Sequence, residues 1–182
     1  VTDKPPVAKN EYVELHIDGL SHEGLGVGKY KGFTLFVKRA LPGETVRAKV
    51  VKLKKQYGYA RLMEILKPSP ARVTPPCSIY KYCGGCQLQH LSYEEQLRQK
   101  RQIVMDNLER IGGLDLDNII VHPTLGMETP WRYRNKAQVP IGERDGGLIG
   151  GFYRQGSHEI IDMQECLIQH EANDQVIQKV KE

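Results

Sequence analysis

The stretch Cys77–Cys86, which reads CSIYKYCGGC, holds three of the four cysteines of this 182-residue chain. The fourth, Cys166, stands far downstream. The spacing Cys-x5-Cys-x2-Cys, closed by a distant cysteine, suits an iron–sulfur cluster, because its irons need four thiolates that converge on one compact core. The glycines at 84 and 85 remove side chains where the backbone must bend around such a core, and they permit positive φ angles. We therefore interpret the four thiols as one metal site that organises the fold.

Three other interpretations of the cysteines stay open at this level. A structural zinc site could use the same thiols, but such sites usually show two short knuckles, and only Cys83 and Cys86 form one here. Two disulfides would need an oxidising compartment, and no apolar signal segment opens the chain. A thioredoxin-like redox pair would need a βαβ context that is absent. We expect a cytoplasmic protein.

Charge is distributed unevenly along the chain. Residues 1–76 carry 14 lysines and arginines against 7 acidic residues, whereas residues 77–182 carry 12 against 15. A basic N-terminal part predicts a polyanionic partner, most simply a nucleic acid, although charge for solubility alone is the alternative. No run approaches the roughly 20 apolar residues of a transmembrane helix, so we expect no membrane partner.

The N-terminal part predicts a small β-rich domain. Residues 1–10 show no periodicity and predict a disordered leader. Period-2 alternation and glycine-rich turns then predict five short strands, at 11–17, 24–28, 34–37, 45–53 and 57–66. This pattern is typical of a small closed barrel of the OB type, here over residues 11–68, followed by a proline-rich linker at 69–76. The glycines within 24–28 fit close backbone approach better than a phosphate loop, because no Gly-Lys-Ser/Thr ending follows.

Cations and aromatic rings alternate where the last two of these strands meet. Lys52, Lys54 and Lys55 stand beside Tyr57 and Tyr59. Lysines neutralise phosphates and tyrosine rings stack on unpaired bases, which together predict a surface for single-stranded RNA. An edge strand protected by lysines is the alternative interpretation.

A capping box at Ser92–Glu95 predicts a helix over 93–111 that ends at a pair of glycines. His90, just before it, is expected to pack or cap rather than to ligate a metal. Strand-like runs follow at 131–141, 147–154 and 157–162, and a second helix begins near residue 173. We therefore predict an α+β iron–sulfur domain over residues 77–170, with 171–182 leading to a domain that the chain lacks.

The first of these runs is dense in cations. In a strand, Arg132, Arg134 and Lys136 would point to one face. Three aligned cations in a segment of negative net charge predict contact with RNA rather than a solvated face.

Several runs resemble, in order, the N-terminal part of the RNA uracil-5-methyltransferases, above all the bacterial 23S ribosomal RNA enzymes. The most specific are Phe36–Val46 (FVKRALPGETV) and Cys77–His90 (CSIYKYCGGCQLQH), and the others are Gly24–Val27, Tyr133–Lys136 and Gly151-Phe152 with Cys166. The resemblance implies an RNA-binding TRAM domain on residues 11–68. It also implies a [4Fe-4S] cluster held by Cys77, Cys83, Cys86 and Cys166.

In that family a C-terminal domain of Rossmann type binds S-adenosylmethionine. A cysteine there attacks C6 of the uracil so that C5 accepts the methyl group, on a base taken out of its stack. This chain offers no residue for either task, since its four cysteines are assigned to the cluster and no Gly-x-Gly-x-x-Gly unit opens a helix. We predict the RNA-binding, cluster-bearing part of a 23S ribosomal RNA uracil-C5 methyltransferase, monomeric and inactive by itself.

Two rival functions remain at the level of sequence. One is a stand-alone RNA-binding module that contains a metal and has no catalytic activity. The other is a radical methylthiotransferase, which can also carry a TRAM domain. That enzyme would need Cys-x3-Cys-x2-Cys, and the x5 spacing here argues against it.

Overall fold

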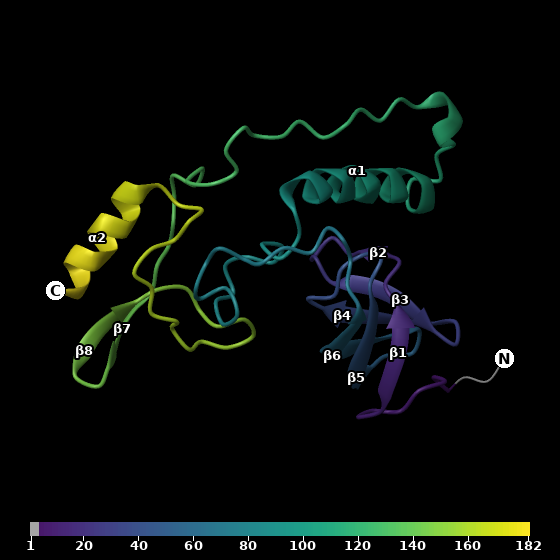
Figure 1. Cartoon of the computed structure of the whole chain (residues 1–182), viewed down its shortest axis with the longest axis horizontal. Helices are drawn as coiled ribbons and strands as arrows, with labels where there is room; N and C mark the ends of the chain where they lie inside the picture. Colours follow the sequence, from purple (N-terminus) through teal and green to yellow (C-terminus); the bar gives the residue numbers. More distant parts are fainter. Residues whose placement is uncertain (1–3) are drawn as a thin grey trace. The chain divides into compact units, whose positions relative to one another are not determined.

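The basic N-terminal part folds into one six-stranded sheet (Figure 1). The computed structural model describes residues 4–182. Neighbouring strands follow the order β1-β5-β6-β4-β3-β2, and only β4 and β6 run parallel. The five predicted strands are confirmed and β2 is an addition; the bounds are Tyr12–His16 (β1), Gly19–Leu20 (β2), Gly26–Tyr30 (β3), Phe33–Lys38 (β4), Thr45–Leu53 (β5) and Tyr57–Lys67 (β6).

The edge strands of this sheet, β1 and β2, are consecutive in the chain, and only Ile17 and Asp18 separate them. Two residues cannot span six strands that lie about 4.8 Å apart, so the sheet curls until its edges meet. The connection between them lies against β3, where the Asp18 N–H donates to the Val27 carbonyl (2.8 Å). Within residues 4–182, no strand pairing joins β1 to β2 along the seam where the two edges meet. The predicted closed barrel is therefore corrected to a curled open sheet.

Glycines in β3 allow two neighbouring segments to approach this strand closely. A side chain on Gly28 would collide with the carbonyl oxygen of His16, and one on Gly26 would come within 2.7 Å of the carbonyl oxygen of Ala40. Close backbone approach therefore explains these glycines, as predicted.

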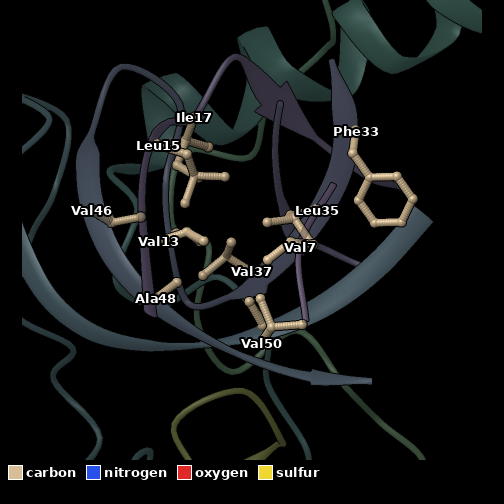
Figure 2. Close-up of a cluster of buried hydrophobic side chains, with 12 residues drawn as sticks. Val7, Val13, Leu15, Ile17, Phe33, Leu35, Val37, Val46, Ala48 and Val50 are labelled. Atoms are coloured by element: carbon tan, nitrogen blue, oxygen red, sulfur yellow. The ribbon is translucent and has the colours of Figure 1, made fainter. Parts of the chain in front are cut away.

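The core of this unit fills the inside of the curl (Figure 2). Strand β4 illustrates the alternation, because Phe33, Leu35 and Val37 are buried while the residues between them are half-buried. The buried cluster consists of Val7, Val13, Leu15, Ile17, Phe33, Leu35, Val37, Ala40, Val46, Ala48, Val50 and Ala60.

The predicted disordered leader is wrong for its later part. Val7 belongs to the buried cluster, and the Asn10 N–H donates to the carbonyl of Val50 (2.8 Å). An apolar anchor and a backbone hydrogen bond thus extend the sheet beyond β1. Residues 1–3 of that prediction lie outside the described residues.

Residues 69–72, predicted to be part of a linker, pack against the loop between β4 and β5. The fully buried Glu44 pairs with Arg72 (2.6 Å) and accepts hydrogen bonds from the N–H groups of Leu41 (2.9 Å) and Ser69 (3.3 Å). Burial alone would raise the pKa of Glu44, but Arg72 and the two N–H donors hold it below its ordinary value. The ALPGE motif therefore ends in a carboxylate that fastens this segment to the sheet.

Helix α1 spans Tyr93–Arg110, close to its predicted bounds, and Ser92 caps it by accepting the N–H of Glu95 (3.4 Å). Only half of the capping box forms, because the Ser92 N–H donates to the carbonyl of Ala71 instead. No residue of α1 is fully buried. His90 is buried as predicted, at 3% exposure, near Arg72 and Glu44.

The chain divides into two compact units, and the division differs from the predicted domains. The first joins the chain up to Val73 with His90–Leu125, which includes α1 and the short 3-10 helix Leu116–Asn118. The second joins Thr74–Gln89 with Gly126–Glu182. Residues 90–125, placed in the iron–sulfur domain by the sequence, thus pack with the sheet.

The second unit has little regular structure. A hairpin of β7 (Ile141–Arg144) and β8 (Gly147–Gly150) and helix α2 (Glu171–Lys181) are its elements. The predicted strand at 131–141 is wrong except at its last residue, because Arg132 has a φ of 57° that breaks an extended run. The predicted strand at 157–162 contributes only an isolated bridge between Tyr153 and Ile160. Across residues 4–182, no helix combines the length and apolarity needed to cross a membrane.

Candidate metal centre and nucleic-acid interface

All four cysteines line one hollow in the second unit, between the 77–89 segment and residues 163–168. Each is a free thiol; Cys83 is buried and the other three are half-buried. The charge of the downstream Cys166 raises the pKa of all three thiols in the CSIYKYCGGC run, and those three also influence one another. Each of the six pairs of thiols is therefore close enough for electrostatic coupling.

Short turns fold the CSIYKYCGGC run around the hollow. The N–H groups of Tyr82 and Cys83 both donate to the Ile79 carbonyl (2.9 Å each). The Gly84 N–H donates to the carbonyl of Tyr153 (2.9 Å), and a side chain on Gly84 would come within 2.8 Å of that oxygen. Neither Gly84 nor Gly85 has a positive φ. Of the two expected reasons for these glycines, the positive φ is wrong, whereas the need to remove a side chain is confirmed for Gly84.

An ion pair clamps Cys166 in position. The Arg132 guanidinium donates to the Cys166 carbonyl (2.9 Å) and to the Asp174 carboxylate (2.6 Å). The same carboxylate accepts hydrogen bonds from the Cys166 N–H (3.0 Å) and from the Gln169 side chain (2.6 Å). The backbone N–H and the carbonyl of Cys166 are thus both held by one charged pair, whose carboxylate comes from Asp174 of α2.

The hollow disfavours bare thiolates and also supplies donors to their sulfurs. Burial is the main cause that raises the pKa values of Cys77, Cys83 and Cys86. Hydrogen bonds lower them in part, including one from the Gly85 N–H to the Cys83 sulfur (3.3 Å) and one from Gln89 to Cys86. Four crowded thiolates need a cationic partner, and N–H donors around the sulfurs are typical of cysteine-ligated clusters.

The donor set therefore fits a four-thiolate group in number and kind. In residues 4–182, however, no three histidine, cysteine, aspartate or glutamate side chains are gathered closely enough to hold a single metal ion as they stand.

A second candidate site lies on the outer face of the curled sheet, opposite the core. The rings of Phe36, Tyr57 and Tyr59 form a cluster there, with centroids 5.6 to 5.7 Å apart. Parallel pairing of β4 with β6 sets Phe36 beside Tyr59. The two tyrosines were predicted from the sequence. Phe36 was missed, because its partner strand could not be inferred from local alternation.

Cations flank this aromatic cluster. Lys52 is the cross-strand partner of Tyr59, and next to that pair a row of Lys38, Arg61 and Lys49 crosses three strands. In the described part of the chain none of these four cations forms an ion pair with a carboxylate. Lys54 and Lys55 lie in the exposed turn between β5 and β6. The row was missed by the sequence analysis, although its outward positions follow from the strand alternation.

The predicted cationic strand of the second unit does not form. Arg132 is engaged by Asp174 and Glu165 (3.0 Å), so its guanidinium is part of the Cys166 clamp. Arg134 pairs through its backbone with Ile168 and His170, and Lys136 is exposed in an irregular segment. The three side chains therefore do not share one strand face.

Comparison with known proteins shows which families and structures this chain resembles. Residues 6–63 match the TRAM domain family. A protein of Halalkalibacterium halodurans named as an uncharacterized RNA methyltransferase is 58% identical over 97% of the chain, and one of Bacillus cereus with the same name is 55% identical. The crystal structure of Pyrococcus abyssi tRNA (uracil-54, C5)-methyltransferase with S-adenosyl-L-homocysteine matches 92% of the chain at 27% identity and a TM-score of 0.59. The chain spans 38% of those two relatives and 35% of that structure.

Proposed function

We propose that this chain is the RNA-binding and cluster-bearing part of an S-adenosylmethionine-dependent RNA uracil-C5 methyltransferase, which forms 5-methyluridine. The observation that carries the proposal is the likeness of 92% of the chain to the structure of a tRNA (uracil-54, C5)-methyltransferase. Two relatives of more than 50% identity bear the name of RNA methyltransferase, and residues 6–63 match the TRAM domain. The basic, aromatic outer face of the sheet supports a role in holding RNA.

Cys77, Cys83, Cys86 and Cys166 would hold a [4Fe-4S] cluster. Four free, mutually coupled thiols and N–H donors around the sulfurs support this assignment. When bound, the cluster supplies four thiolate–iron bonds that join the CSIYKYCGGC run to the segment around Cys166. The role we assign to it is that of a structural staple, since iron–thiolate bonds would tie together segments some 80 residues apart. These bonds would compensate for the small apolar core of this unit.

We assign methyl transfer to the part of the relatives that this chain does not span. With every cysteine engaged in the cluster, none is left as a nucleophile toward C6 of uracil. We therefore expect this polypeptide alone to bind S-adenosylmethionine poorly and to leave RNA unmethylated.

The proposed substrate is a uridine of 23S ribosomal RNA, because the sequence motifs resemble those of the bacterial enzymes that act on this RNA. Transfer RNA is the second candidate, because the matched crystal structure is that of a tRNA methyltransferase. Both fit an outer face that combines cations with stacking rings, since neither feature reads a base sequence.

Metal analysis tests the cluster. The chain is purified without oxygen, and its iron, acid-labile sulfide and zinc are measured beside its absorption spectrum. We expect about four irons and four sulfides per chain, as the composition of a [4Fe-4S] cluster requires. Zinc without iron or sulfide would overturn the assignment.

Activity tests the rest of the proposal. A full-length enzyme that contains this chain is incubated with S-adenosylmethionine and with unmodified 23S ribosomal RNA or tRNA, and 5-methyluridine is measured by mass spectrometry. We expect the product in ribosomal RNA. Product only in tRNA would make tRNA the substrate. Absence of product in both RNAs would favour the alternative function, an RNA-binding module without catalytic activity.

A further inference from the structure

A hollow of about 460 Å³ opens on the outer face of the sheet, over the aromatic cluster. Phe36, Tyr57 and Tyr59 line it together with Thr34 and Gln56, and the loop Ser21–Leu25 completes the lining. This volume falls in the range of roughly 300 to 1,000 Å³ that is usual for small-molecule sites. The hollow therefore has room for an unstacked nucleobase.

The loop that lines the hollow is held in a defined shape. Its ends are joined by the hydrogen bond from the Ser21 N–H to the Leu25 carbonyl (2.8 Å), and the Ser21 hydroxyl accepts the Leu25 N–H (3.1 Å). Gly24 takes a φ of 76°, which favours glycine and closes the turn. A loop fixed in this way is ready to bind without paying for its own ordering.

The floor of the hollow consists of flat rings with restrained orientations. The Phe36 and Tyr59 planes are tilted by 33°, whereas Tyr57 stands nearly perpendicular to both. Burial, the neighbouring Tyr57 hydroxyl and the charge of Glu23 raise the pKa of Tyr59. Its hydroxyl is thus a neutral group at neutral pH and adds no charge to the floor of the hollow.

The charges around the hollow select a base rather than a phosphate. Glu23 is the one acidic residue among those that line it, and a carboxylate repels phosphate while it accepts N–H groups from a base edge. The cations stand beside the hollow, with Lys52 paired across the strands to Tyr59 and Lys29 paired to Thr34. A backbone that follows these lysines would present its base toward the rings.

We propose that this hollow is a binding site for one unpaired nucleobase of RNA, which stacks on Tyr59 and Phe36 while Glu23 and Gln56 pair with its polar edge. The inference rests on the proposed function, because it takes RNA as the partner. It goes further by assigning a site for one base to the curled sheet.

Binding of short oligoribonucleotides to the cluster-loaded chain tests the inference. The probes are a labelled oligouridylate, the same oligomer with one abasic ribose at its centre, and a duplex of equal length. We expect Tyr59→Leu to weaken binding of the intact oligomer about tenfold, in line with a loss of base stacking. The slope of affinity against salt should stay the same, because the phosphate contacts remain.

Tyr12→Leu is the matched control, since Tyr12 is an exposed tyrosine of the same sheet that does not line the hollow. Cross-linking of an oligomer that carries 5-iodouracil provides a readout without any variant, and we expect adducts at Tyr57, Tyr59 or Phe36. In addition, Glu23→Gln should change the preference among oligomers that differ in one central base, with little effect on the salt slope.

The outcomes separate this inference from the proposed function. If the wild-type chain binds RNA with a steep salt dependence but Tyr59→Leu binds equally well and cross-links map elsewhere, the base site is wrong and the RNA-binding role stands. If the wild-type chain binds none of the probes, ribosomal RNA or tRNA, both fail.

Discussion

The two units of this chain are held together in different ways. The curled sheet encloses a cluster of twelve buried apolar residues. The second unit buries few apolar side chains, among them Met163, Ile168 and Ile177, and its only sheet within the described residues is a hairpin of four-residue strands. Apolar burial stabilises the first unit. We expect the second to rely on the proposed cluster and on the Arg132–Asp174 pair, so loss of a few specific contacts should affect it far more.

Replacing Cys86 with serine gives the sharpest test of this comparison. Without the full ligand set, the cluster should be lost, and the second unit should unfold while the curled sheet stays folded, because metal binding supplies on the order of 10 kcal/mol to small metal-held folds. Hydrogen exchange measured by mass spectrometry would report each unit separately. Ser78→Ala, at an exposed position of the same run, is the control.

A folded second unit in iron-free Cys86→Ser would end the staple interpretation. It would favour a cluster that senses redox state, which requires a stable form without iron. Unfolding of both units together would show instead that the sheet depends on the second unit, and the two units would then not differ in what stabilises them.

Asp174→Ala should produce the next largest effect, again confined to the second unit. The substitution leaves the Arg132 guanidinium, the Cys166 N–H and the Gln169 amide without their shared acceptor. Loss of one partner of a largely buried pair costs about 3 kcal/mol. Denaturant unfolding of the cluster-loaded chain measures the change. Glu171→Ala, which removes an exposed carboxylate 3.9 Å from the same arginine, should be nearly silent.

Acidification should weaken the first unit through His90. Burial, then the charges of Arg72 and Arg39, lowers the pKa of His90 to about 4. The unfolded chain takes up this proton near pH 6.5 and the folded chain only near pH 4, so stability is lost as the pH falls between those values. The loss amounts to roughly 2 to 3 kcal/mol. Glu44, whose pKa is lowered too, contributes in the same direction as it is protonated.

Unfolding of the first unit measured at pH 7 and pH 4.5 would check this, with His90→Gln as the comparison. The variant should lose less stability between the two pH values than the wild type does. An equal loss in both would show that carboxylates, rather than His90, dominate the acid response.

The same contrast explains what the sequence could predict. Period-2 alternation located five strands, because each of them buries one face on a local core. The run from Trp131 was wrongly predicted to be a strand. Arg132 has a left-handed backbone and contacts carboxylates 33 to 42 residues away, which local alternation cannot reveal. Likewise, the proximity of Phe36 to Tyr59 follows from a parallel pairing that local patterns do not encode. Cysteine spacing anticipated one hollow for four thiols, while the group that they bind stays a prediction.

The smallest of the expected effects is a difference between the two units in how the salt dependence of RNA binding responds to loss of cations. Removal of Lys52 and Arg61 on the sheet should lower the slope of log affinity against log salt by about 1.4, from about 0.7 for each contact with a single strand. Arg134→Ala with Lys136→Ala should change the slope less, because these side chains share no strand face and residues 77–182 are net negative. Arg132 is unsuitable here, since its loss would disturb the Cys166 clamp. An equal drop in slope for both pairs would mean that RNA crosses both units, and the cationic segment would regain the role that its sequence predicted.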